Sequence, residues 1–362
     1  MFSKNLKYYR LKNGMSMKEL ASLVGVSSMT ISYYESGERK PGMDTIKALA
    51  GVLGVKVTDF LSNRNENLVF AHGEFRKGSK LSVKQQDYIK ESVEEYLGRF
   101  YSVIDVLGGD VLPEAPECHG LALTNNIEEN ALAMRRYLHI AEFGPAGNLV
   151  ELLENKGILV YITEVDNDTF SGMNGSVNGR PYIIINGRMS AERIRSTIAH
   201  EMAHFIFKWP DNMEEKQIED TATAVSGAFL LPFADARREL GIRRTAVTKD
   251  MTLTCKEYGI SMYLLVKRAN LCGIINDNVA RNFYIQAGQA GWKKHEPSRI
   301  RQEDPMLFMQ LVFRAVSENE ISVQKGAELL KQSYSFVEGQ CFAWKGGPEI
   351  MSREKNEEIL VR

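Results

Sequence analysis

The sequence predicts a multidomain fold in which an all-α domain, an α+β domain and a helical C-terminal segment follow one another. Its 362 residues are too many for one small domain, and an apolar fraction of 44% is sufficient for more than one core. Three patterns predict the order: short helices separated by glycines in residues 1–62, two strand-like runs before a long helix near residue 200, and only helical patterns after residue 300.

Residues 1–62 predict five short, closely packed helices. Asn13-Gly14 ends the first, and the capping box Ser16-Met17-Lys18-Glu19 begins the second. Gly25 makes a turn, after which Ser27 caps the third helix. Helix, glycine turn and helix form the helix-turn-helix signature. The segment also carries nine basic side chains against five acidic ones, a balance that suits a polyanion such as double-stranded DNA.

Five stretches of this segment form a dense pattern: Ser16-Met17-Lys18-Glu19-Leu20-Ala21, Gly25-Val26-Ser27, Ile31-Ser32, Glu35-Ser36-Gly37 and Arg39-Lys40-Pro41. Through them, residues 1–62 resemble the XRE (lambda-repressor-like) family over their whole length. The resemblance implies that five side chains face the major groove of DNA: Ser27, Ser28, Met29, Thr30 and Tyr33. It also implies that Lys18, Arg39 and Lys40 contact phosphates.

The expected groove-facing side chains include no Arg, Gln or Asn, which are the residues that make bidentate contacts with bases. Sequence specificity is therefore expected to be modest or to depend on DNA shape. A homodimer would match paired half-sites in an operator. The alternative for this segment is a helical module that docks on a protein.

Residues 63–139 predict a linker and a helical connector. The polar run at 63–67 is typical of a linker, and a capping box at Ser82 begins an amphipathic helix that Gly108-Gly109 ends. A dimerisation helix and a helix that packs on its own domain are both consistent with this pattern. A further helix is expected at 127–138, with Arg135 and Arg136 exposed.

Residues 140–300 predict the α+β domain. Strands are expected at 158–162 and 181–186, with a polar, glycine-rich turn or loop at 166–179 between them. The strand at 181–186 could pair its edge with a substrate peptide, or form the core of a sheet, or both. Ser190 then caps a long helix that contains His200 and His204.

The stretch Ile198 to Ile206 contains the pattern H-E-x-x-H within an apolar run. Residues four apart lie on one face of a helix, so His200 and His204 can bind one metal ion. Glu201 can reach a water on that metal and act as a base, which is the zinc-peptidase arrangement. The alternative is two helical histidines and a surface glutamate without a metal, but unpaired histidines would be costly in an apolar helix.

Two histidines leave zinc one protein ligand short. The candidates that follow are Glu214, Glu215, Glu219 and Asp220. Glu219 begins a run rich in Ala, Ser and Gly, which permits close packing against another helix and would place this carboxylate beside the metal. Glu214 and Glu215 lie in a charged connection, where solvated side chains are the expectation.

A second family resemblance covers about residues 140–300. It is carried by Glu192 to His204, by Glu219 with Gly227-Ala228-Phe229-Leu230-Leu231-Pro232, and by Ile260-Ser261-Met262, Arg268-Ala269, Gly291-Trp292 and Glu296-Pro297. In these stretches the chain resembles the ImmA/IrrE family of zinc peptidases. The resemblance implies His200, His204 and Glu219 as ligands of one Zn²⁺ ion, with Glu201 as the base. Ala203 stands where the family usually has glycine. The residue that stabilises the oxyanion stays open among Arg195, Tyr161 and His295.

Residues 301–362 predict further helices and a charged tail at 352–362, and they could cap the preceding domain or form a partner surface. The four cysteines form no C-x-x-C pair, so no disulfide framework is expected. There is no signal peptide and no apolar run long enough for a bilayer, which makes the cytoplasm the expected compartment and a membrane an unexpected partner.

Two hypotheses for function follow. The first is a DNA-binding transcriptional regulator that carries a zinc-dependent endopeptidase, with a repressor-type regulatory protein as the substrate that the second resemblance implies. The second is a non-proteolytic or antitoxin-like regulator whose metal domain is a sensor or scaffold. The complete H-E-x-x-H pattern favours the first, because a scaffold does not need Glu201.

Overall fold

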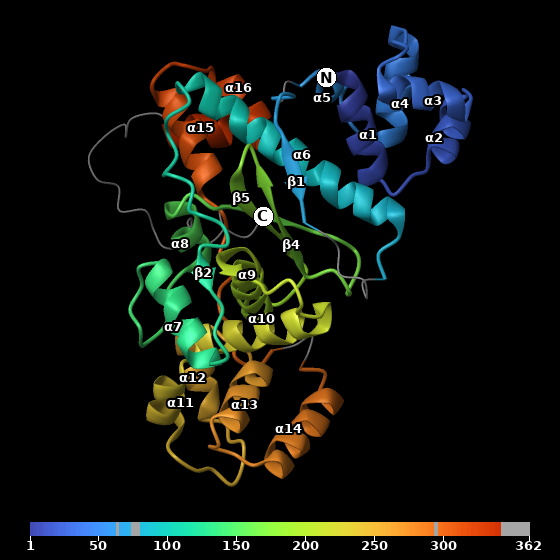
Figure 1. Cartoon of the computed structure of the whole chain (residues 1–362). Helices are drawn as coiled ribbons and strands as arrows, with labels where there is room; N and C mark the ends of the chain where they lie inside the picture. The colour runs from blue at the N-terminus through green and yellow to red at the C-terminus, as the bar shows by residue number, and fades with distance from the viewer. Residues whose placement is uncertain (63–64, 74–79, 293–295, 342–362) are drawn as a thin grey trace. The chain divides into compact units, whose positions relative to one another are not determined.

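The computed structural model describes residues 1–62, 65–73, 80–292 and 296–341 (Figure 1). The chain forms two units. One contains Met1–Ser102 and Val111–Met306, and the other contains Val103–Asp110 and Leu307–Arg362. Within the described residues, no helix combines the length and the hydropathy that crossing a membrane requires.

The N-terminal region consists of five helices, as expected. Their bounds are α1 Phe2–Lys12, α2 Met17–Val24, α3 Ser28–Ser36, α4 Met43–Leu53 and α5 Val57–Leu61. Ser16 and Glu19 form the expected capping box, and Gly25 adopts the left-handed conformation that closes α2. The core is built from Leu6, Leu20, Ile31, Leu49 and Phe60, none of which is exposed. A buried ion pair between Arg10 and Glu35, at 2.5 Å, ties α1 to α3.

The connector contains two long helices, α6 Val83–Val106 and α7 Ile127–Tyr137, and two short strands, β1 Phe70–His72 and β2 Leu121–Ala122. Of the expected linker at 63–67, residues 63–64 lie outside the described part of the chain, and β1 follows directly behind it. The expectation for Arg135 was wrong. Its side chain is fully buried and donates hydrogen bonds to the carbonyls of Ala141, Gly144 and Phe229, which satisfy the guanidinium without an exposed face.

Four strands form a mixed sheet in the order β1-β4-β5-β3. The α+β domain contributes three of these strands, β3 Leu159–Thr163, β4 Gly172–Val177 and β5 Arg180–Asn186. β3 and β5 are parallel, whereas β4 is antiparallel to both β5 and β1. Two parallel two-residue strands, β2 and β6 Phe207–Lys208, form a separate ladder.

One expectation about this sheet was wrong, and of the alternatives for the strand at 181–186 the structure bears out the sheet core. The polar, glycine-rich stretch at 166–179 is not only a loop, because it contains β4. The strand at 180–186 is not an edge, because β4 and β3 pair with its two sides. Hairpin β4–β5 turns at Asn178 and Gly179, whose φ angles of 49° and 79° are those of a two-residue primed turn.

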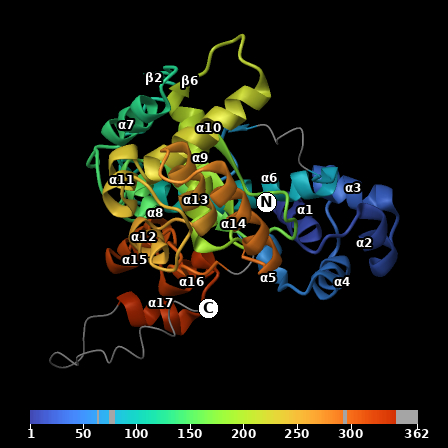
Figure 2. The same cartoon turned by 90° about the horizontal axis from the view of Figure 1, so that it is seen from below.

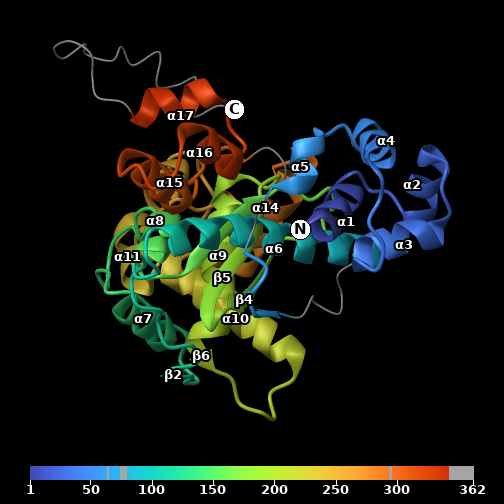
Figure 3. The same ribbon diagram turned by 90° about the horizontal axis from the view of Figure 1, so that it is seen from above.

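Side chains of alternate residues cover the two faces of the sheet. Val160, Ile183 and Ile185 pack into one core with Ile198 and Met202 of α9 (Ala191–Ile206). On the opposite face, Tyr161 stacks on Tyr96 of α6, with ring centroids 4.2 Å apart. Figure 3 shows α6 passing over β5 and β4 on this side. The sheet is therefore closed on both faces by helices.

The remaining helices of this unit are α8 Leu149–Asn155, α10 Glu215–Leu230, α11 Phe233–Leu240, α12 Met251–Tyr258, α13 Met262–Leu271 and α14 Asp277–Gln289. α9 and α10 lie side by side, as Figure 2 shows, and Ala222, Val225 and Phe229 of α10 belong to the same core as α9. The small residues of α10 thus permit the close helix contact that the sequence predicts.

The second unit contains α15 Leu307–Ser317, α16 Val323–Leu330 and α17 Tyr334–Cys341. Its core includes Val316, Ala327 and Val337. Gly326 is required by close packing, since a Cβ there would lie 2.9 Å from Val316 Cγ2. The expected charged tail at 352–362 lies outside the described residues.

Candidate metal centre and nucleic-acid interface

The helix that carries the H-E-x-x-H pattern is positioned by the strand before it. β5 ends at Asn186, whose buried side chain accepts a hydrogen bond from Val165 N–H and donates to the carbonyls of Val165 and Phe170. Ser190 then caps α9 by accepting from the N–H of Arg193. A fixed strand end and a capped helix start set the direction in which His200, Glu201 and His204 project.

Three side chains from two helices converge on one point. His200 and His204 come from α9, and Glu219 comes from the second turn of α10. The two Nε2 atoms of the histidines are 3.0 Å apart. The carboxylate of Glu219 lies 3.4 Å from Nε2 of His200 and 3.3 Å from Nε2 of His204. Glu214 and Glu215 begin α10 and, like Asp220, are not part of this cluster.

These distances fit a tetrahedral metal ion. Zinc bonds of about 2.0–2.1 Å place any two ligand atoms of a tetrahedron about 3.3–3.4 Å apart, close to the three separations found here. Two imidazoles and one carboxylate are a common donor set for catalytic zinc, which keeps its fourth position open. The three side chains therefore fit a divalent ion of this kind.

Neighbouring residues hold the histidines in place. Oγ1 of Thr223, one turn after Glu219 on α10, lies 3.3 Å from Nδ1 of His200. The indole of Trp209 donates to the carbonyl of His204 at 3.1 Å, and its ring lies 5.7 Å from the His204 ring. Such outer contacts fix the tautomer and the orientation of metal-binding imidazoles.

Glu201 is buried and is held by a residue that the sequence motifs did not predict. The side-chain amide of Asn174 on β4 donates to Oε2 of Glu201 at 2.9 Å. The signal that could have located β4 was the Asn178-Gly179 pair, which is typical of a hairpin turn between two strands. The neutral amide holds one oxygen of this carboxylate, and the other oxygen is the one suited to accept a proton.

A cavity of about 880 Å³ opens beside His200. Its walls come from α9, α10 and α13, and they include Arg193, Asp220, Tyr263 and Lys267. A cavity of this size accommodates several residues of a peptide, and the basic and acidic groups on its walls can orient one.

Two of the three expected candidates for an oxyanion donor, Arg195 and Tyr161, do not lie at this centre. Arg195 is buried and donates to the carbonyls of Gly147 and Gly259 and to the carboxylate of Glu303. Tyr161 is on the opposite face of the sheet, stacked on Tyr96. His295 lies outside the described residues.

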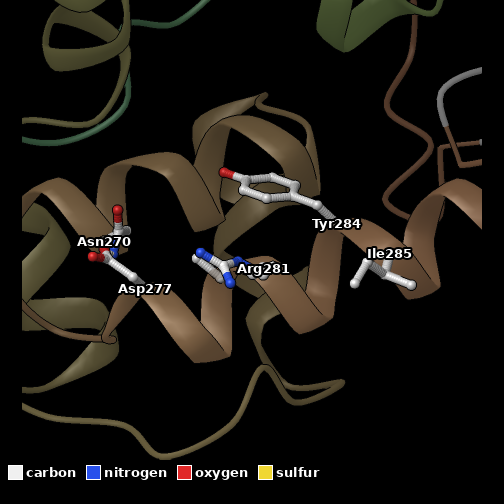
Figure 4. A pocket seen from close by; sticks show the side chains of 6 residues that line it. Asn270, Asp277, Arg281, Tyr284 and Ile285 are labelled. Atoms are coloured by element: carbon white, nitrogen blue, oxygen red, sulfur yellow. Dashed lines mark hydrogen bonds between the residues drawn. The ribbon is translucent and has the colours of Figure 1, made fainter.

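A smaller hollow lies between α13 and α14, with a volume of about 430 Å³. Figure 4 shows Asp277, Arg281 and Tyr284 of α14 together with Asn270 of α13. The amide of Asn270 donates to Asp277 at 3.0 Å, so these two groups satisfy each other. None of the three clustered metal-site residues lines this hollow.

The side chains expected at a DNA interface lie around α3 and the loop behind it. Ser27, Ser28, Met29 and Tyr33 are exposed, and Thr30 is half-buried. Ser27 also caps α3, since its Oγ accepts from the N–H of Thr30 at 3.0 Å. Lys18, Arg39 and Lys40 are exposed as well. The exposed groups among these are accessible to DNA.

The fold and the metal centre together define a class. A mixed sheet leads into a helix with two histidines and a glutamate, and a second helix supplies a carboxylate, which is the arrangement of a zincin-like domain. Comparison with known families agrees. Residues 6–60 match the family described as Helix-turn-helix, and residues 153–270 match the one described as IrrE N-terminal-like domain. The chain therefore joins an XRE-type helix-turn-helix region to an IrrE-like domain of metallopeptidase-like fold.

Two curated proteins are similar over short stretches. The "Cryptic phage CTXphi transcriptional repressor RstR" of Vibrio cholerae is 29% identical over 68 residues, which is 19% of this chain and 61% of that protein. The "SPbeta prophage-derived uncharacterized HTH-type transcriptional regulator YonR" of Bacillus subtilis (strain 168) is 36% identical over 61 residues, 17% of this chain and 56% of its own length. The chain thus spans little more than half of these relatives.

Proposed function

We propose that this protein is a DNA-binding transcriptional regulator whose IrrE-like domain is a zinc-dependent endopeptidase. The observation that carries the proposal is the convergence of His200, His204 and Glu219 beside a buried Glu201. A structural metal site would be closed by four protein ligands. Here the described cluster supplies three, which would leave a fourth position for water, and Glu201 follows His200 directly on the same helix.

The chain's own residues account for the proton transfers in peptide hydrolysis. When bound, zinc supplies Lewis acidity to the water and the peptide carbonyl that enter the site. Glu201 takes a proton from the attacking water and returns it to the leaving amine. Asn174 holds Oε2 of Glu201, which leaves Oε1 to receive that proton. Thr223 keeps His200 in its ligand orientation.

The proposed substrate is a regulatory protein of the repressor type. The cavity beside His200 is large enough for a stretch of polypeptide. The similarity of part of the chain to a phage repressor and to a prophage-derived regulator supports a role in gene control. In the helix-turn-helix region, the proposed groove-facing residues are Ser27, Ser28, Met29, Thr30 and Tyr33, and the proposed phosphate contacts are Lys18, Arg39 and Lys40. A homodimer would place two such regions on paired half-sites.

Replacement of Glu201 by glutamine tests the peptidase. The variant should bind one zinc ion per chain as the wild type does, because Glu201 is not a ligand, and cleavage should fall by about 10²–10⁴-fold because the base is lost. Zinc content is measured by inductively coupled plasma mass spectrometry. Cleavage is measured on a mixed-sequence peptide library and on purified helix-turn-helix repressors, with cut sites identified by peptide mass spectrometry.

Glu214→Gln is the matched control, since Glu214 is an exposed acid at the start of α10. This control should keep both zinc binding and cleavage. Cleavage by Glu201→Gln at the wild-type rate would refute the assigned role of Glu201. A wild-type protein that holds zinc and cuts neither kind of probe would favour the sensor hypothesis.

A further inference from the structure

The strand β1 belongs to the connector between the two domains, yet it pairs with a strand of the metal-site domain. Phe70, Ala71 and His72 lie opposite Val177, Ser176 and Gly175 in an antiparallel register. The pairing continues at both ends: Asn178 N–H donates to the Val69 carbonyl at 2.8 Å, and Gly73 N–H donates to the Asn174 carbonyl at 2.9 Å. β1 therefore occupies the outer edge of β4.

This edge is directly connected to the proposed base. Asn174 uses its backbone carbonyl to accept from Gly73 and its side-chain amide to hold Glu201, each at 2.9 Å. Gly73 is therefore hydrogen-bonded to the same residue that holds Glu201, the proposed base. A peptide that pairs with β4 in the place of β1 would also lie beside Asn174.

The side chains of β1 are divided between the two faces of the sheet. His72 lies 2.6 Å from the hydroxyl of Tyr182 and 3.3 Å from Glu94, and its ring stacks on Phe70. Ala71 and Gly73 alternate with these residues, so they lie on the face of α9. Both are small, and a Cβ at Gly73 would come within 2.4 Å of the Asn174 carbonyl. The face of β1 toward the metal therefore carries almost no side chain.

The order of the sheet leaves few places for an added strand. β5 is paired on both sides, and β3 is at the end opposite β1. Extended peptides add to sheets through main-chain hydrogen bonds, which tolerate many sequences. Adjacent strands are about 4.8 Å apart, so one edge accepts one strand at a time. A substrate strand beside Glu201 requires the edge that β1 now holds.

We propose that the outer edge of β4 binds the extended backbone of the substrate, and that β1 is an intramolecular competitor for this edge. This inference rests on the proposed function, because it names the regulation of the same site. β1 is three residues long, and Ala71 is exposed, so its release exposes little apolar surface. Covalent attachment nevertheless gives it a high effective concentration, which a peptide in solution must overcome.

The test is peptide binding to a protein that cannot cut. A fluorescein-labelled peptide of residues 67–73 serves as the probe, and its anisotropy is measured with the Glu201→Gln protein. A second substitution then weakens β1: Ala71→Pro removes an N–H from the paired strand, and Gly73→Val introduces the clash with Asn174. Each should tighten peptide binding by about tenfold or more, because the tethered competitor is lost.

Val69→Ala is the matched control, since Val69 is exposed and this change keeps every backbone group. Hydrogen exchange of the Asn178 amide gives an independent measurement. Exchange of this amide should be faster in the Ala71→Pro and Gly73→Val proteins than in the Glu201→Gln protein, and addition of the peptide should slow it again. Equal peptide affinity in all four proteins, or exchange at Asn178 that the peptide does not slow, would overturn the proposal.

The two proposals fail separately. Peptide binding is measured without hydrolysis, so tight binding to the Ala71→Pro protein together with an inactive wild type would reject the peptidase and retain the β4 edge as a binding site. Cleavage by the wild type without any gain in peptide affinity would reject the competitor and retain the peptidase.

Discussion

Two acidic side chains share one buried serine, Ser298. Ser298 Oγ lies 2.7 Å from a carboxylate oxygen of Glu192 and 3.4 Å from one of Glu296. Glu296 also accepts from Met262 N–H at 3.0 Å, at the start of α13. Burial raises the pKa of Glu296, and although the Met262 hydrogen bond opposes this, the charge of Glu192 raises the pKa further.

This raised pKa predicts a pH-dependent loss of stability. The folded state holds the Glu296 proton to a higher pH than the unfolded state, whose carboxyl has the ordinary pKa of 4.5. The contribution of this group to the free energy of unfolding therefore falls as the pH rises from 4.5 through the raised value. Glu296→Gln removes this titrating group. The free energy of unfolding of the variant minus that of the wild type should therefore be larger at about pH 8 than at about pH 5.

Urea unfolding at the two pH values measures this change. The control is Glu257→Gln, an exposed acid on α12 whose stability difference from wild type should stay the same. A Glu296→Gln difference that is equal at both pH values would show that Glu296 titrates alike in the folded and unfolded chains.

The residues of the metal centre were predictable to different degrees. His200, Glu201 and His204 follow from spacing on one helix, which the sequence displays directly. Glu219 lies on a separate helix and followed less directly: among four acids, the small residues behind it favoured Glu219, and the family resemblance implied the same residue. Asn174 and Thr223 could not be predicted, because their positions depend on how β4 and α10 pack against α9.

Among the elements, the segment from Glu296 to Met306 shows how a stretch without helix or strand stabilises others. Glu303 accepts from the N–H groups of Leu149 and Val150 at 2.8 and 3.3 Å, two donors at the start of α8, and it also pairs with Arg195 of α9. Met306 N–H donates to Glu154 near the end of α8. Burial lowers the pKa of Arg195 to about 10, so the side chain is still charged at neutral pH and its charge is buried beside Glu303.

Glu303→Ala should therefore be strongly destabilising. It leaves the charge of Arg195 buried without its carboxylate and removes the acceptor of two N–H groups at the start of α8, for a loss of about 3 kcal/mol in the free energy of unfolding. Glu318→Ala, which removes an exposed pair with Arg314, should cost less than about 1 kcal/mol. Urea unfolding followed by circular dichroism compares the two, and similar losses would contradict the role assigned to Glu303.

The elements themselves were predicted where a local signal exists. The helices of residues 1–62 agree with their caps and glycine turns, and β3 and β5 agree with their apolar runs. β1 and β4 were missed. β4 is rich in glycine and polar residues, and β1 is three residues long. β1 is a strand because of a pairing partner distant in the chain, which no local pattern contains. β4 pairs with the neighbouring β5, and its local signal, the Asn178-Gly179 turn, was overlooked.

For the whole molecule, a net charge of −1 conceals a basic N-terminal region. If Arg39 and Lys40 contact phosphates, replacing both by alanine should reduce the salt dependence of DNA binding. The slope of log affinity against log salt should become shallower by about 2, because each phosphate contact contributes about 0.9. The change should appear on mixed-sequence duplex DNA, since phosphate contacts do not depend on base sequence.

Anisotropy titrations between about 50 and about 200 mM salt provide these slopes. Lys249→Ala with Lys256→Ala is the matched control, because both lysines are exposed in the IrrE-like domain and the net charge changes equally. The same loss of slope in the control would mean that overall charge, not the helix-turn-helix region, governs the salt effect.

The register of β1 has a consequence for the newly made chain. Phe70 and its partner Val177 are more than a hundred residues apart, whereas β4 and β5 are joined by a two-residue turn. During synthesis β1 leaves the ribosome long before its partner exists, whereas β5 follows β4 after two residues, so we expect the β4–β5 hairpin to close first. Contacts between distant segments form late. We therefore expect an interval in which the outer edge of the strand beside Glu201 is bare, before the connector takes its place.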